Sequence, residues 1–493
     1  MRITSFFAAF AASALLACGS SGTGPCTTGG FCTGADAGDL DSSLDPDTDP
    51  FGNQDGSVET QPPCVNLQCQ QVTCQSGDTT ITGKVYDPGG KTPLYNVFVY
   101  VPNAPLLPID TGPKCTACQA PASGNPVVSA TTDEKGEFVI HNVPVGQDIP
   151  LVMQLGKWRR RITLPSVTAC VDNNFNTKKV YDPGVDKTTE SLMRLPKKQV
   201  EGSPDDNIPL MAMVTGSCDY AECFLANTIG IDPSEFGGTN TTKRVRLYRG
   251  NDSSSKQLPA GTGTGLGLWG SYAEMAKYDI IFGACECSDY DRTTAGYTNM
   301  KKYLEAGGRM FGTHYYYNFF ASPTGPTDFD GVAKWNTGGY DNDLAPYYVD
   351  QTFPKGKAMA SWLFDVKATT TQGRLDNLYD LRHDVDQIVT PKATRWLYSG
   401  QQSGNTYKTL YMSFNTPVNK PVVDQCGRAV FSDVHLSGSS YTSYTSQPFP
   451  QWCGSRAAGS GYENNEAALE FLFFDLASCV QDDQKPPVVP PPN

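Results

Sequence analysis

Residues 279–317, DIIFGACECSDYDRTTAGYTNMKKYLEAGGRMFGTHYYY, decide the fold of the larger part of this chain. The apolar run at 279–283 predicts a buried strand, and the run at 309–313 predicts another. Between them, the large apolar residues of 299–308 recur at helical spacing, and two consecutive glycines end the helix. A strand, a helix and a second strand in this order predict a unit of a parallel sheet.

The same alternation runs through residues 205–480 and predicts an α/β domain built on a parallel sheet of the flavodoxin type, covered by helices. The predicted strands are 209–214, 244–248, 279–283, 309–313 and 428–433. Within this domain the stretch 318–425 is too long for a plain loop. We expect it to form a helix near Trp362 and two strands at 394–398 and 407–414, and to cover the crevice of the domain.

Residues 77–200 show short alternating strands separated by turns, without an amphipathic helix, and predict an all-β domain. Three stretches of it, ITGKVYDPGGKTPLYNVFVYV, TTDEKGEFVIHNVPVG and IPLVMQLG, resemble the carboxypeptidase regulatory-like family. The resemblance implies a transthyretin-like β-sandwich that serves as a spacer or binding module without catalysis. The chain is therefore predicted to be multidomain, with an insertion at 102–127 that departs from the family's pattern.

A basic run, KWRRR at 157–161, interrupts an otherwise acidic protein. It fits two interpretations. In one, charge protects a solvated strand edge from pairing with another chain. In the other, the run docks on an acidic surface, either the second domain or lipopolysaccharide.

The chain begins with Arg2 and an apolar run from Phe6 to Leu16, which is shorter than the roughly 20 residues needed to span a bilayer. Residues 1–18 therefore predict an export signal. The ending LLAC resembles the bacterial lipobox, which implies cleavage before Cys18 and acylation of its thiol. We expect a lipid-anchored protein of the outer membrane, facing the periplasm or the surface. The domain layout also resembles large exported lipoproteins of myxobacteria.

Two further segments are poor in large apolar residues. Residues 19–76 are acidic and rich in turn formers, and predict a disordered tether that ends in a cysteine-rich neck. Residues 481–493 are rich in proline and predict a disordered, extended tail.

The formal net charge of −13 argues against nucleic acid as a partner. Sixteen cysteines in an exported chain imply disulfides. The candidates are Cys115, Cys118, Cys218, Cys223, Cys285 and Cys287. We expect Cys115 and Cys118 to staple a loop by disulfide bonding, because no second ligand pair for zinc is evident. We expect Cys285 and Cys287 to be in disulfides as well, since exposed thiols oxidise outside the cytoplasm, and Cys218 and Cys223 are their plausible partners. No cofactor and no metal is expected.

Ligands of an open parallel sheet bind beyond the carboxyl ends of its strands. That rule brings together His314, Asp433 and His435 as candidates for acid–base chemistry or for a metal. It also brings Glu286, Tyr315 and Tyr316 to the same crevice, where we expect ligand contacts. Each histidine also fits a plainer interpretation, in which it is simply hydrogen-bonded near a strand end.

The stretches YDIIFGACE, NMKKYLEAGGRMFGTHYYY and GRAVFSDVHLSG resemble the class I glutamine-amidotransferase-like fold, including its trehalose-utilisation-like branch. In that family the strand after the Gly-Gly turn leads to an elbow that bears a nucleophilic cysteine. Here His314 occupies the elbow, and His435 lies where the family places its base. The missing cysteine argues against glutamine hydrolysis.

Two main functions fit these observations. The first is a non-catalytic binding protein of the cell envelope, whose ligand is a carbohydrate or another surface polymer. The alternative is an envelope hydrolase of glycans or peptides that uses His314, Asp433 and His435 with water or a metal. A third interpretation is a structural spacer whose crevice is a relic.

Overall fold

The computed structural model describes residues 63–115, 118, 121–251, 256–321, 329–337, 345–378, 381–403, 406–436, 447–453 and 463–488. Pro63–Asn493 form one compact unit, separate from Met1–Pro62. The unit therefore begins inside the segment 19–76 that we predicted to be tether and neck. The export signal and Cys18 lie outside the described residues.

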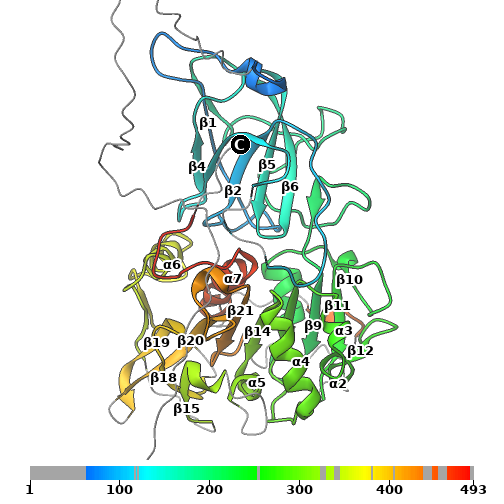
Figure 1. The fold of residues 1–493 in the computed structure, drawn as a ribbon, viewed down its shortest axis with the longest axis vertical. Helices are drawn as coiled ribbons and strands as arrows, with labels where there is room; N and C mark the ends of the chain where they lie inside the picture. Colours follow the sequence, from blue (N-terminus) through cyan, green and yellow to red (C-terminus); the bar gives the residue numbers. More distant parts are fainter. Residues whose placement is uncertain are drawn as a thin grey trace, which may run out of the picture. The chain divides into compact units, whose positions relative to one another are not determined.

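The first half of the unit is all-β (Figure 1). Its smaller sheet has the order β4-β1-β7, in which β1 is antiparallel to β4 and parallel to β7. Its larger sheet has the order β3-β2-β5-β6-β8, in which all neighbours are antiparallel. Burial alternates along the smaller sheet, where Ile81, Phe138 and Ile140 enter a core shared with the larger sheet. The strands are β1 (Thr80–Lys84), β2 (Phe98–Pro102), β3 (Pro126–Thr131), β4 (Glu137–Ile140), β5 (Gly146–Leu155), β6 (Trp158–Val167), β7 (Asp172–Asn174) and β8 (Asp206–Asn207).

The second half is built on one mixed sheet with the order β10-β11-β9-β13-β14-β21-β20-β19-β16-β17. The strands from β10 to β21 are parallel, and β9, β13 and β21 are buried along their whole length, as in a sheet covered on both faces. The parallel part consists of β9 (Met211–Thr215), β10 (Phe236–Gly237), β11 (Val245–Arg249), β13 (Ile280–Gly283), β14 (Arg309–Thr313) and β21 (Gly427–Ser432), and β12 (Gly263–Thr264) pairs with β11.

The insertion 318–425 contributes strands to this sheet. Strand β20 pairs antiparallel with β21, and β19 and β16 follow it outward. The two predicted strands and the helix near Trp362 are present. The insertion contains β16 (Tyr347–Val349), β17 (Arg374–Leu375), β19 (Ala393–Ser403), β20 (Thr406–Thr416) and α6 (Pro354–Asp365), and β15 (Ala333–Trp335) pairs with β18 (Val385–Ile388) beside the main sheet.

Helices connect and cover the parallel strands. The predicted helix between β13 and β14 is α4 (Thr293–Glu305), which buries Met300, Tyr303 and Leu304. The other helices are α1 (Ala221–Cys223), which continues as a π-helix over Phe224–Thr228, α2 (Gly265–Trp269), α3 (Tyr272–Met275), α5 (Asn318–Ala321) and α7 (Glu463–Ala477). No helix among the described residues is both long enough and apolar enough to cross a membrane.

Helix α7 lies at the junction of the two halves (Figure 1). Phe474 of α7 packs against Trp158 of the all-β half, and Phe471 stacks on Tyr95, in one hydrophobic core that continues into both halves. The basic run at 157–161 takes part in this junction. Lys157 Nζ lies 2.5 Å from Asp279 Oδ1 of the α/β half, and Arg159 is buried. The run is thus not a solvated strand edge, and its first residue contacts an acidic group of the α/β half.

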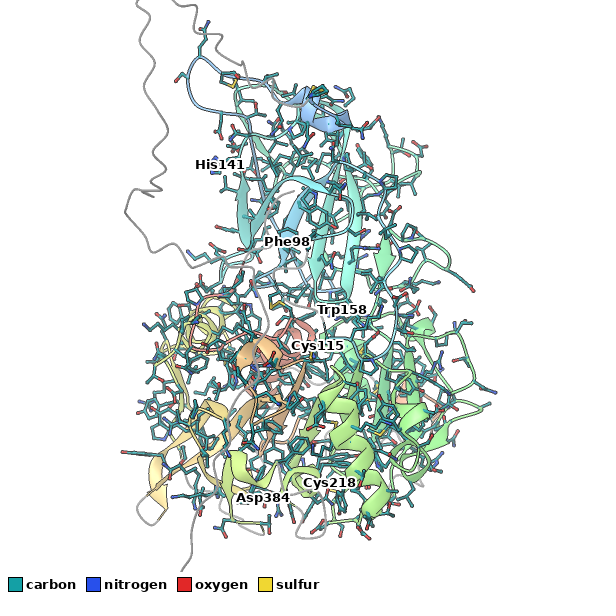
Figure 2. All side chains as sticks on the ribbon, in the orientation of Figure 1. Phe98, Cys115, His141, Trp158, Cys218 and Asp384 are labelled. Atoms are coloured by element: carbon teal, nitrogen blue, oxygen red, sulfur yellow. A yellow bond between two sulfur atoms is a disulfide. The ribbon has the colours of Figure 1, made fainter. Side chains whose placement is uncertain are left out.

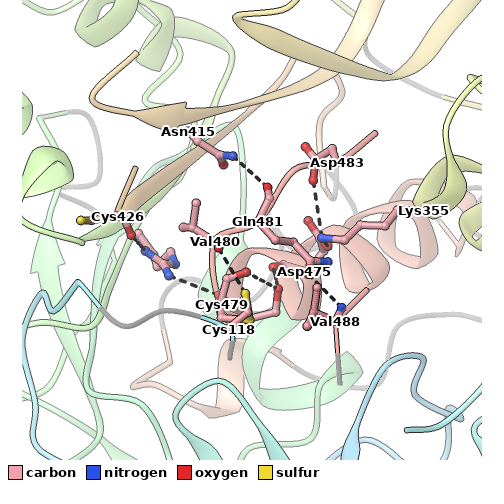
Figure 3. The surroundings of a disulfide bond; sticks show 12 residues. Cys118, Lys355, Asn415, Cys426, Asp475, Cys479, Val480, Gln481, Asp483 and Val488 are labelled. Carbon is pink, nitrogen blue, oxygen red and sulfur yellow. Dashed lines mark hydrogen bonds and ion pairs between the residues drawn. A yellow bond between two sulfur atoms is a disulfide. The ribbon is translucent and has the colours of Figure 1, made fainter. Parts of the chain in front are cut away.

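Disulfides also join the two halves. Cys118 pairs with Cys479 (Figure 3). Cys115 pairs with Cys426, so the segment 102–127 of the all-β half is bonded to the α/β half at two points. The expectation that Cys115 and Cys118 staple their own loop is therefore wrong. The remaining pairs are Cys64–Cys69, Cys74–Cys170, Cys218–Cys287 and Cys223–Cys453.

Residues 481–488 are fixed to the fold, although we expected them to begin a disordered tail. Asp483 is buried and lies 2.9 Å from Arg428 Nη2, and the same nitrogen lies 2.9 Å from Asp475. Asn415 donates to the Gln481 carbonyl at 3.1 Å (Figure 3). Residues 481–488 have few apolar side chains, and they are held to the α/β half by ion pairs and by a main-chain hydrogen bond.

Candidate functional site

Four polar side chains meet beyond the carboxyl ends of the parallel strands. Asp219 follows β9, Cys285 follows β13, His314 follows β14 and His435 follows β21. We call these four residues the strand-end cluster. In Figure 2, Cys218, which precedes Asp219, lies at the end of the sheet away from the all-β half, whereas Trp158 and Cys115 lie at the junction. The cluster therefore lies where an open parallel sheet places its ligands.

Asp219 organises the cluster from a wholly buried position. Its Oδ1 lies 2.8 Å from His435 Nδ1 and accepts from the Leu436 N–H at 2.9 Å. Its Oδ2 accepts from the Thr313 hydroxyl at 2.7 Å. Burial acts to raise the pKa of Asp219, but His435, His314 and the Thr313 hydroxyl together hold that pKa below its ordinary value. Asp219 is therefore a carboxylate at neutral pH.

His435 takes its orientation from two partners. The Asp219 carboxylate holds Nδ1, and Asn465 of α7 donates to the His435 carbonyl at 2.6 Å. A carboxylate on Nδ1 leaves Nε2 as the ring nitrogen that can bind a proton or a cation. The His435 side chain is 15% exposed, which makes it the accessible histidine of the cluster.

His314 stands at the turn between β14 and the 3-10 helix His314–Tyr317, with a positive φ of 49°. This left-handed conformation is uncommon outside glycine and often occurs at functional sites. The His314 and His435 ring centroids are 3.6 Å apart. Burial, reinforced by His435, holds the pKa of His314 well below its ordinary value, so its imidazole is neutral.

Cys285 is a buried thiol, so the prediction that it forms a disulfide is wrong. Cys287 pairs with Cys218, one of the two partners that we expected for it. An oxidising compartment acts on exposed thiols, and Cys285 is only 1% exposed. Cys285, His314 and His435 each offer one ligand atom, and these three atoms lie within 4.8 Å of one another.

Asp433, the carboxylate that we predicted for the site, contacts the insertion. Its Oδ2 accepts from the Asp384 N–H at 2.9 Å, and its carbonyl accepts from the Arg382 N–H at 2.9 Å. Burial, together with the Asp384 charge, raises the pKa of Asp433 well above its ordinary value. Asp219 takes the place beside His435 that we expected for Asp433. Asp219 comes four residues after β9, the first buried strand of the domain, and this position was the signal that could have identified Asp219.

Glu286 and Tyr316 are both buried and bonded within the protein. The Tyr316 hydroxyl donates to Glu286 at 2.7 Å, and Arg292 lies 3.0 Å from the same carboxylate. These contacts make both side chains part of the core rather than of a ligand-facing wall.

Tyr315 is only partly buried and lies nearer the surface. Arg382 stacks on its ring, 4.3 Å from the centroid, and donates to its hydroxyl at 3.0 Å. Among the three predicted ligand contacts, Tyr315 is the one whose side chain retains some exposure.

Comparison with known proteins yields distant structural likenesses. No protein-family model matches the chain, and no curated protein matches its sequence. A putative ThuA-like protein from Bacteroides uniformis shares 10% identity, with 55% of this chain and 95% of that chain covered and a TM-score of 0.29. The mmIFT52 N-terminal domain shares 10% identity over 54% of this chain and 97% of that chain, with a TM-score of 0.27. A cytoplasmic protein from Salmonella typhimurium shares 9% identity over 56% of this chain and 100% of that chain, also with a TM-score of 0.27.

Proposed function

We propose that the α/β half is a hydrolase that cleaves a glycan or peptide of the cell envelope with water. The observation that carries this proposal is the contact between Asp219 and His435 Nδ1 at 2.8 Å. A buried carboxylate that orients an imidazole fixes its tautomer and supports its positive charge during proton transfer. His435 then presents Nε2 either to the attacking water or to a cation that activates this water.

The surroundings of His435 support hydrolysis more than simple ligand binding. A second imidazole and a thiol lie beside it, both almost wholly buried. Grouping such side chains at a strand end costs stability, since each polar group leaves water. Carbohydrate binding needs no such grouping, because aromatic side chains and neutral hydrogen-bonding groups suffice for it. Arg382, which stacks on Tyr315 and is ion-paired with Asp384 at 2.8 Å, adds a polar group near the cluster.

Export and anchoring belong to the same proposal. The segment 1–18 directs the chain out of the cytoplasm, and an acylated Cys18 holds it in the outer membrane. Six disulfides among the described residues suit an oxidising compartment. The all-β half serves as a spacer of the carboxypeptidase regulatory-like, transthyretin-like type, fixed to the α/β half by α7 and two disulfides.

The proposal is tested with the exported, purified full-length chain. The chain is incubated with peptidoglycan and with envelope polysaccharide, and released fragments are identified by mass spectrometry. We expect fragments from the wild type, and a loss of rate of about 10²-fold or more in His435→Ala and Asp219→Asn. His141→Ala is the matched control, because His141 is an exposed histidine of the all-β half.

Two outcomes contradict hydrolysis. One is equal fragment release by the wild type and His435→Ala. The other is no fragment release by the wild type, although the protein is retained on an immobilised glycan. The second outcome supports the non-catalytic binding protein that the sequence first suggested.

A further inference from the structure

We propose that Cys285, His314 and His435 bind one divalent transition-metal ion, with zinc as the best fit. The three residues come from three different strand ends, β13, β14 and β21, and their ligand atoms lie within 4.8 Å of one another. Around a tetrahedral zinc ion, with bonds of about 2.0–2.3 Å, ligand atoms lie about 3.3–3.7 Å apart. Side-chain movements of about an ångström therefore suffice to close the site.

The kinds of donor atom select the kind of ion. One thiolate and two imidazole nitrogens suit zinc and its neighbours, whereas magnesium and calcium prefer oxygen ligands. Three protein ligands leave the fourth tetrahedral position open, as in catalytic rather than structural zinc sites. The Cys285 thiolate and the Asp219 carboxylate together balance the two positive charges of the ion.

Two independent observations point to a ligand at this place. First, apart from a weak contact with the Asp433 main chain, neither ring nitrogen of His314 reaches hydrogen-bond geometry with a described residue, although the side chain is 1% exposed. A buried imidazole without full hydrogen bonds has lost its contacts with water and gained little in return. A metal ion bound to one ring nitrogen would compensate for this loss. Second, Asp219 contacts His435 on Nδ1, which is the outer contact that histidine ligands of zinc usually make.

The inference deepens the proposed hydrolase and rests on it only for the role of the ion. When bound, zinc supplies a water whose pKa is lowered to about 7. Asp219 is then a positioning residue, because it acts through His435. The binding of the ion itself does not depend on any substrate.

Metal binding is measured on the purified full-length chain by dialysis against zinc followed by elemental analysis. We expect one zinc ion per chain in the wild type and in the control His141→Ala. Cys285→Ser and His314→Ala should each weaken binding roughly tenfold or more, and Asp219→Asn about 10- to 100-fold. These variants also separate the cluster from the cysteines at positions 18, 26 and 32, which lie outside the described residues.

A second measurement needs no variant and therefore does not depend on how a variant folds. Loading with cobalt(II) should produce the near-ultraviolet thiolate-to-cobalt charge-transfer band and the intense visible bands of a tetrahedral ion. Absence of the thiolate band in the wild type overturns the site, and so does undiminished zinc affinity in folded Cys285→Ser and His314→Ala.

The two proposals fail in different ways. A chain that binds zinc without releasing envelope fragments retains the metal site and loses the hydrolase. A zinc-free chain that still cleaves its substrate retains the hydrolase, with His435 as its base, and loses the metal site.

Discussion

His435 Nδ1 lies 2.8 Å from Asp219 Oδ1, although 216 residues separate the two along the chain. The contact exists because β9 and β21 are both parallel members of one sheet, and their carboxyl ends face the same way. Every residue of the strand-end cluster reaches the site in this manner, from the end of its own strand. The sheet, rather than any local motif, assembles the site.

Removing the charge of Asp219 should destabilise the protein as well as impair the site. Asp219→Asn replaces a carboxylate that accepts from Leu436 and Thr313 with an amide that has a single acceptor oxygen. We expect the free energy of unfolding to fall by about 2–3 kcal/mol, as for the loss of buried hydrogen bonds to a charged group. Urea unfolding followed by circular dichroism measures this loss.

A structural control is available for the Asp219 experiment. Asp172 accepts from Thr80 and Thr82 on an exposed edge of the all-β half, so Asp172→Asn should change the free energy by well under 1 kcal/mol. If both variants unfold at the same urea concentration as the wild type, Asp219 is not the organising residue that its contacts indicate.

The disulfides between the two halves should contribute much of the stability of their junction. With the Cys115–Cys426 bond in place, the Cys118–Cys479 bond closes a loop of about 56 residues through 115–118 and 426–479, and replacing Cys118 and Cys479 with alanine should lower the free energy of unfolding by about 2–5 kcal/mol. The matched control replaces Cys64 and Cys69 with alanine. The disulfide removed there closes a loop between residues only five apart. Because a short loop constrains the unfolded chain less, we expect a smaller loss there.

Mass spectrometry of peptides from the non-reduced protein tests the pairing itself. A peptide that contains Cys118 should be found linked to one that contains Cys479. A Cys115–Cys118 link in its place would restore the loop staple suggested by the sequence and remove the basis of the stability prediction.

The sequence predicts the sheet much better than it predicts the contacts within the site. Apolar runs place β9, β13, β14 and β21 correctly, and the strand-end rule brings His314 and His435 to the same place. The rule says nothing about which carboxylate meets them. Asp433 is held by Asp384 of the insertion, and where an insertion lies depends on long-range packing that periodicity does not reveal.

The cysteines show the same limit. Export predicted disulfides for both Cys285 and Cys287, yet Cys287 is bonded to Cys218 while Cys285 is a buried thiol. Connectivity cannot be deduced from sequence when partners lie hundreds of residues apart, as for Cys115 and Cys426. The basic run at 157–161 likewise indicated charge, but not that Arg159 would be buried or that Lys157 would pair with Asp279 of the α/β half.

Lipid attachment is predicted to depend on one side chain, that of Cys18. Cells labelled with radioactive palmitate should incorporate the label into the wild-type protein, and Cys18→Ala should abolish it and release the chain from the membrane fraction. Cys32→Ala, a change in the same N-terminal region, should retain the label. Persistent labelling of Cys18→Ala, or a mature chain that still carries Met1, contradicts the proposed anchor.

The stability of the protein should fall as the pH rises from about 4 to about 6 because of Asp206. Burial raises the pKa of Asp206 to about 6 against an ordinary value of 3.8, although Arg160 opposes the shift. In this interval the folded state retains a proton that the unfolded state has released, so the free energy of unfolding falls with rising pH. The rise of the Asp206 pKa from 3.8 to about 6 corresponds to a loss of at most about 3 kcal/mol in the free energy of unfolding.

Asp206→Asn tests this dependence, because the amide is neutral at every pH in the range. The variant should match the wild type below pH 4, where Asp206 is protonated, and should exceed it in stability by about 2 kcal/mol at pH 8. Urea midpoints measured at half-unit steps from pH 3.5 to 8, a range set by the expected interval, give both curves. Parallel curves for the variant and the wild type would falsify the assignment, since the titrating group would then lie elsewhere in the fold.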